Sequence, residues 1–97
     1  MNMRLDLLEI ATKSRENYAL ELYKISLVEQ AINQRAEFGF RTYRIIQDYP
    51  FELNETIAAN QLELWLDQND LGFNWRPTKR LADPPGPVCY SELEINW

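Results

Sequence analysis

The residues of this 97-residue chain that could carry chemistry are one cysteine and a few spaced carboxylates. Cys89 could act as a nucleophile, but the sequence contains no histidine, which is the usual activating base and the commonest metal ligand near neutral pH. Cys89 also falls in phase with the apolar residues of a predicted strand, which favours a packing role. The sequence therefore gives no support for a catalytic cysteine.

Two carboxylate pairs have a spacing that a metal site or an acid–base pair can use. Glu52 and Glu55 are three residues apart, and Glu63 and Asp67 are four apart on a predicted helix. A solvated helix face explains such pairs more simply. A glycine-rich phosphate-binding loop is also missing, because the three glycines stand in separate segments. We therefore predict no catalytic residue, no metal site and no cofactor.

The charge balance limits the class of partner. Ten basic and fifteen acidic residues give a net charge of −5, which repels phosphate backbones and disfavours nucleic acid. A winged-helix DNA binder is disfavoured as well, because the predicted second helix contains no lysine or arginine. Charged residues interrupt the apolar residues near the N-terminus, so we expect neither a signal peptide nor a membrane span. The expected location is the cytosol or a particle assembled there.

In the N-terminal part of the chain, apolar residues recur every three or four positions, which predicts the helices that would position a site. Residues 1–13 form an N-terminal helical segment and residues 14–39 a long helix, so the chain begins with one helix or two. One stripe of the long helix faces the core, and a second series lies roughly opposite to it. A domain this small can hardly cover both stripes. The second series therefore packs on the N-terminal segment or contacts an oligomer or a partner.

Strand and turn signals occupy most of the remaining chain. Residues 40–47 predict a strand, residues 54–71 a second helix, and residues 73–97 a β-hairpin. Within the hairpin we expect the first strand to end at Arg76 and the proline-rich connection 77–87 to lack regular structure. The chain is then one α+β domain, with a long N-terminal helix (or two), a strand, a second helix and a C-terminal hairpin, in which helices cover a small antiparallel sheet.

Periodicity also predicts which side chains are buried in the C-terminal half. The second helix should turn five residues inward: Ile57, Ala58, Leu62, Trp65 and Leu66. Alternation along the last strand should bury one face, formed by Cys89, Ser91, Leu93, Ile95 and Trp97, and expose the other, formed by Glu92, Glu94 and Asn96.

Aromatic and basic residues beside turns are further candidate contacts. Tyr49 and Phe51 flank Pro50, where aromatic groups either anchor an interface or complete a thin core. The basic residues of the hairpin either neutralise an acidic surface or bind an acidic partner. Together with the second helical stripe, these residues make up the predicted partner-binding set: Leu20, Tyr23, Leu27, Ala31, Tyr49, Phe51, Arg76, Lys79 and Arg80.

Four short segments mark the ends of predicted elements. The long helix begins with Ser14-Arg15-Glu16-Asn17 and ends with Ala36 to Gly39, and two later segments are Leu71-Gly72-Phe73 and Ile95-Asn96-Trp97. In this order of features, residues 14–97 resemble small accessory proteins of tailed bacteriophages. The resemblance implies a phage protein of the virion or the host cytoplasm. The expected function is a non-enzymatic, minor structural component of the virion, in the capsid, neck or baseplate, that contacts other virion subunits. The alternative is an intracellular inhibitor or sponge for a host enzyme or defence protein, and a homo-oligomer stays open in either case.

Overall fold

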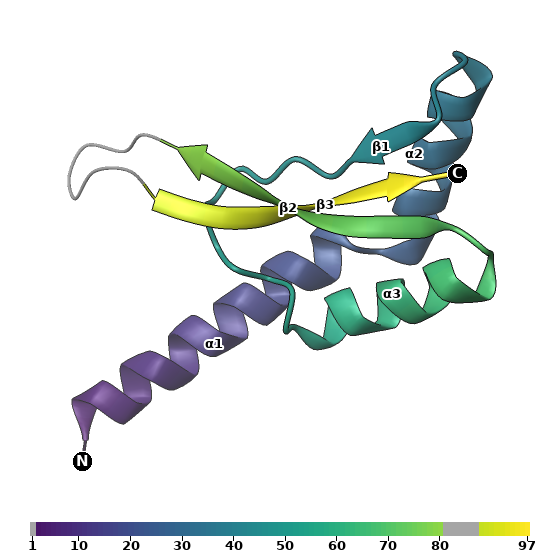
Figure 1. The fold of residues 1–97 in the computed structure, drawn as a ribbon. Helices are drawn as coiled ribbons and strands as arrows, with labels where there is room; N and C mark the ends of the chain where they lie inside the picture. The colour runs from purple at the N-terminus through teal and green to yellow at the C-terminus, as the bar shows by residue number, and fades with distance from the viewer. Residues whose placement is uncertain (1, 81–87) are drawn as a thin grey trace.

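The computed structural model describes residues 2–80 and 88–97, which form an α+β fold (Figure 1). The elements follow in the order α1 (Met3–Leu22), α2 (Ile25–Glu37), β1 (Thr42–Arg44), α3 (Ile57–Gln68), β2 (Gly72–Arg80) and β3 (Val88–Asn96). The described strands form one antiparallel sheet in the order β1–β3–β2, with β3 in the centre. The predicted fold class, with its long first helix and C-terminal hairpin, is confirmed. Residues 81–87 of the predicted connection lie outside the described residues.

The N-terminal helical region is interrupted at Tyr23 and Lys24, and not near residue 13. α1 runs through Thr12, whose hydroxyl donates to the carbonyl of Leu8 within the helix at 2.8 Å. The predicted helix 14–39 was therefore wrong as a single element. The break has a packing reason, because it lets Ala19 and Tyr23 before it, and Val28 after it, enter the same core.

The core lies between the helices and one face of the sheet. Leu62 and Leu66 of α3 are fully buried in the same core cluster as Leu93 and Ile95 of β3. Ile57 is 65% exposed, so its predicted inward position was wrong. The preceding residue, Thr56, caps α3 by accepting a hydrogen bond from the backbone N–H of Ala59 at 3.2 Å, so Ile57 begins the first turn and points away from the core.

The opposite face of the sheet is more buried than alternation predicted. Glu92, expected to be exposed, is 4% exposed because Arg44 and the backbone of Gln47 bind its carboxylate. Cys89, expected to be buried, is exposed. The two corrections have different causes: the segment after β1 covers the polar face at Glu92, whereas the core on the other face does not extend along β3 as far as Cys89.

β2 continues through Pro77 to Arg80, beyond its predicted end at Arg76. The backbone of Ser91, which is the partner of Pro77 in the register, points away from β2, because its N–H donates to the Glu52 carboxylate. The backbone of Pro77 consequently points away from β3, toward the edge of the sheet. A proline is tolerated at an edge because the ladder needs no N–H there.

Candidate protein-binding surface

Exposed large apolar side chains of the described chain are most concentrated in residues 3–15 of α1, here called the arm. Asn2 caps the helix by accepting a hydrogen bond from the N–H of Arg4 at 3.1 Å. Figure 1 shows the arm extending away from the sheet and from α2 and α3. All its residues are exposed, and its five large apolar side chains are between 51% and 74% exposed: Met3, Leu5, Leu7, Leu8 and Ile10.

These apolar side chains occupy two faces of the helix. At 100° per residue, Met3, Leu7 and Ile10 fall within a sector of roughly 60°, and Leu5 and Leu8 fall within another of roughly 60°. Together the two sectors make up roughly a third of the circumference, and Arg4 lies between them. Full burial of one such side chain stabilises by about 1.5–3 kcal/mol, so a protein that covers the arm gains a large binding energy.

An aromatic cluster lies at the root of the arm. The ring of Tyr18 packs edge-to-face on Tyr49 and Phe51, with ring centroids 5.3 Å and 6.0 Å away. The guanidinium of Arg15 lies 5.5 Å from the centroid of the Phe51 ring. Tyr49 is 56% exposed. The structure thus places the predicted contact residues Tyr49 and Phe51 beside α1, and the apolar surface of the arm continues onto them.

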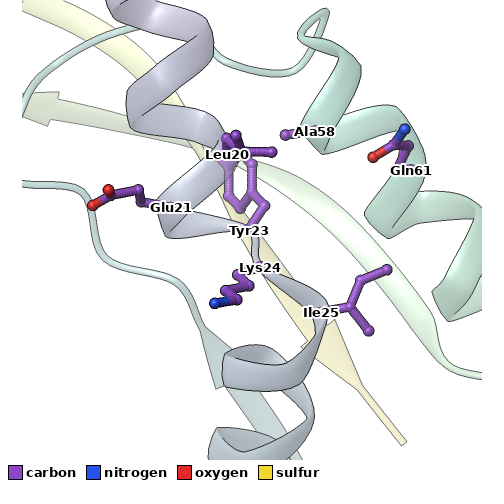
Figure 2. A pocket seen from close by; sticks show the side chains of 7 residues that line it. All are labelled: Leu20, Glu21, Tyr23, Lys24, Ile25, Ala58 and Gln61. Carbon is purple, nitrogen blue, oxygen red and sulfur yellow. The ribbon is translucent and has the colours of Figure 1, made fainter.

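A separate hollow of about 470 Å³ lies at the break between α1 and α2 (Figure 2). Its side chains come from the helix junction and from α3: Leu20, Glu21, Tyr23, Lys24, Ile25, Ala58 and Gln61. The lining is largely apolar, with the charged residues Glu21 and Lys24 among its members.

Tyr23 was predicted to belong to an exposed contact stripe, and this prediction was wrong. Its side chain is 2% exposed and its hydroxyl donates to Oε1 of Gln47 at 3.4 Å. Burial raises the pKa of the Tyr23 hydroxyl well above its usual range, and the nearby Tyr18, Glu92 and Glu52 raise it further. Tyr23 is a core residue that also lines the hollow.

The other members of that stripe do not form one straight seam. Leu20 is 60% exposed on α1 and Leu27 is 54% exposed on α2, while Ala31 is half-buried. The chain changes direction between α1 and α2 (Figure 1), so these residues belong to two separate helix surfaces.

The predicted basic residues belong to β2 and not to the arm or the hollow. Nη2 of Arg76 lies 3.1 Å from Oε1 of Glu94, which fits the neutralisation of an acidic surface. Lys79 is exposed, and the side chain of Arg80 lies outside the described part of the structure. The nine predicted residues are therefore spread over several surfaces.

Of the two predicted carboxylate pairs, Glu52 and Glu55 line one hollow of about 220 Å³ together with Glu16. Burial raises the pKa of the Glu63 carboxyl, a hydrogen bond from the Trp75 side chain lowers it, and Asp67 raises it. Glu52 is occupied by the backbone N–H of Ser91. Among residues 2–80 and 88–97, no cluster of three or more cysteine and carboxylate side chains could hold a metal ion. No helix in the same residues is long and apolar enough to cross a membrane.

The exposed apolar surface of the arm was not predicted, although its sequence carried the signal. RLDLLEI places apolar residues on two faces of a helix, on either side of Arg4, which is more than one flat packing neighbour can cover. The sequence alone left open whether the following helix covers this segment, since that depends on where the chain turns.

The chain matches no family model, no curated protein and no solved structure. Its function is therefore argued from its own surface.

Proposed function

We propose that this protein is not an enzyme and that it acts by binding another protein through the arm of α1. One observation carries the proposal: all five large apolar side chains between Met3 and Ile10 are more than half exposed, on a part of α1 that no other described element covers. Large apolar patches on a soluble domain mark interaction surfaces.

The shape of this patch indicates how the partner binds. A helix with apolar side chains on two of its faces is buried best in a groove, because a flat surface contacts only one side of it. Helices shorter than about 12–15 residues are marginally stable in water on their own, so a groove would also stabilise the helical form of the arm. The partner is expected to offer a groove lined by apolar side chains.

The root of the arm is held in a fixed direction. Oε1 of Glu16 accepts a hydrogen bond from the N–H of Ile57 at the start of α3, at 3.1 Å. The hydroxyl of Tyr18 accepts one from the N–H of Asp48 at 2.8 Å. These bonds connect α1 to two other segments, so that α1 loses less orientational freedom on binding than a flexible tail would.

For the biological role we keep the prediction from the sequence. We propose that the protein is a minor structural component of a phage virion and that the arm docks on a larger subunit. The alternative is an inhibitor whose arm occupies a host protein. A virion component should co-purify with particles, whereas an inhibitor should be recovered with one host protein and be missing from particles.

The experiment that tests the proposal compares two variants of the immobilised protein in lysate from infected cells. Leu5→Asp/Leu8→Asp introduces charges into one apolar face of the arm. Lys13→Ala, on the polar side, is the control, because its only described partner is the exposed Glu9 at 3.4 Å. A captured protein is then purified, and its affinity is measured directly. Loss of capture with the double variant alone supports the proposal, and equal capture by both variants contradicts it.

A further inference from the structure

The sheet has an open edge along β1 and the residues that follow it. The backbone N–H groups of Ile45 and Gln47 both donate to acceptors on β3, at 2.9 Å and 2.8 Å. Backbone direction alternates along an extended segment, so Arg44 and Ile46 turn their N–H and C=O groups outward, away from β3. Within the described part of the chain, these outward groups have no hydrogen-bond partner.

A hollow of about 400 Å³ borders this edge, and its lining consists of Arg35, Tyr43, Arg44 and Ile46. Nε of Arg35, on α2, donates to the carbonyl of Thr42 at 3.3 Å, which holds the guanidinium at one end of the edge. Ile46 is 68% exposed at the other end. The hollow therefore presents a cation and an apolar side chain beside unpaired backbone groups.

The opposite edge of the sheet, on β2, is less suited to an added strand. Pro77 turns toward that edge and has no N–H to donate, and the exposed Lys79 adds a charge. Proline and lysine are the residues that discourage pairing at an edge. The sequence from Thr42 to Gln47 contains neither residue type. An added strand is therefore expected at β1 and not at β2.

We propose that the edge from Thr42 to Ile46 binds an extended segment of another protein, which adds to the sheet as an antiparallel strand beside β1. In this mode of binding the backbone hydrogen bonds supply the attachment, and the side chains beside the edge supply the specificity. β1 lies apart from the arm (Figure 1), so the inference goes beyond the proposed function and does not depend on it.

The guanidinium of Arg35 determines which charge the segment carries. Its described contacts are the neutral carbonyl of Thr42 and the ring of Phe40, whose centroid lies 3.8 Å from Cζ. Among residues 2–80 and 88–97 it forms no ion pair with a carboxylate. Arg35 is half-buried, which strengthens its attraction for an opposite charge relative to a fully exposed site. The segment is therefore expected to place an acidic residue beside Arg35.

The two faces of the sheet fix the spacing of the segment's side chains. Tyr43 lies on the core face, where α2 packs, and Ile46 lies on the other face. A residue opposite Tyr43 can therefore reach Arg35, whereas a residue opposite Ile46, three positions away, packs on the isoleucine. In an antiparallel strand the apolar residue comes first along the chain. The segment that fits consequently has an apolar residue followed, three positions later, by an acidic one.

NMR titration of the full chain with synthetic peptides tests the inference. The probe is a threonine-rich peptide that carries isoleucine and, three residues later, glutamate; in the control peptide these two residues are exchanged. Binding is expected at about millimolar peptide, because only a few contacts are made. The amides of Arg44 and Ile46 should shift and exchange hydrogen more slowly, whereas those of Phe73 and Trp75, which face outward on β2, should not change.

The control peptide should bind about fivefold more weakly, because its glutamate no longer meets Arg35. Absence of shifts at Arg44 and Ile46 up to several times the expected concentration, on the order of 10 mM peptide, overturns the inference. Equal binding of the two peptides, or equal shifts along β2, overturns it as well.

Charge reversal at Arg35 separates recognition from a structural role. Arg35→Glu should bind the glutamate peptide about tenfold more weakly and should instead prefer a peptide with lysine in place of glutamate. Arg41→Glu is the matched control, because it makes the same change at an exposed arginine that does not line the hollow, and it should keep the original preference. An Arg35→Glu variant that still prefers the glutamate peptide contradicts the inference.

A second variant keeps the test valid if Arg35→Glu disturbs the contact between α2 and β1. Ile46→Asp changes an exposed side chain and should leave the fold intact while weakening the probe peptide at least fivefold. Unchanged binding by Ile46→Asp overturns the placement of the apolar residue. Leu5→Asp/Leu8→Asp, in the arm, should bind the peptide like the wild type, so failure at this edge and failure of the arm as a binding surface are distinguished.

Discussion

Nε of Arg44 on β1 and Oε1 of Glu92 on β3 lie 3.0 Å apart on the face of the sheet opposite the core. Oε2 of the same carboxylate accepts a hydrogen bond from the backbone N–H of Gln47 at 2.8 Å. Glu92 thereby fixes both β1 and the segment that follows it to the central strand. On the same face, the pair between Arg76 and Glu94 is more open to solvent, with side-chain exposures of 52% and 22%.

Glu92→Ala is expected to lower the free energy of unfolding by about 2–4 kcal/mol, because it leaves Nε of Arg44 and the buried N–H of Gln47 without their acceptor. Glu94→Ala is the matched control and should cost less than about 1 kcal/mol, since exposed ion pairs contribute little. Urea denaturation followed by tryptophan fluorescence measures both. Equal losses in the two variants would show that Glu92 does not fasten β1 to the sheet.

The stability of the core is expected to depend on the buried face of α3 and not on its exposed face. Leu66 is fully buried, whereas Leu64 is 62% exposed on the same helix. Leu66→Ala should therefore cost about 2–5 kcal/mol, and Leu64→Ala should stay within about 0.5 kcal/mol of the wild type. Thermal and urea unfolding of the two variants provide the measurement. A larger loss for Leu64→Ala would mean that α3 turns another face toward the sheet.

Alkaline pH is expected to destabilise the fold through Tyr23. Its pKa is raised in the folded state, chiefly by burial, above the value of 10.0 expected for an unperturbed tyrosine. Above about pH 10 the unfolded chain loses this proton first, so the free energy of unfolding falls as pH rises. Tyr23→Phe should flatten this decline, and Tyr49→Phe, at an exposed ring, is the control. An unchanged slope in Tyr23→Phe would contradict the role assigned to this buried hydroxyl.

Local sequence patterns were sufficient to predict the order of helices and strands in this fold, but not the break between α1 and α2. The periodicity of α3 and the alternation at Leu93 and Ile95 are repeated signals, and the structure confirms both elements. The break at Tyr23 and Lys24 has no glycine or proline to mark it. It follows from core packing around Tyr23, which depends on residues distant in sequence.

The candidate site was harder to predict for the same reason. Tyr49 and Phe51 were chosen because they flank a proline, and the structure places them beside α1, where they contact Tyr18. Tyr23 belongs to the same periodic series as Leu20 and Leu27, yet Tyr23 is buried and the two leucines are exposed. The prediction assumed one straight helix, and periodicity alone cannot show which of its faces the rest of the fold covers. That the arm is exposed became clear only from the positions of the sheet and of α2 and α3 relative to it.

The central claim is that the arm is a binding surface and not a part of the core. Its most direct test is to measure two quantities on the Leu5→Asp/Leu8→Asp variant: the free energy of unfolding, and the affinity for the protein captured by the wild type. Unfolding should change by less than about 1 kcal/mol, because these side chains are exposed in the isolated chain, while the affinity should fall by more than about 100-fold. An unchanged affinity, or a loss of several kcal/mol in stability, would contradict the account.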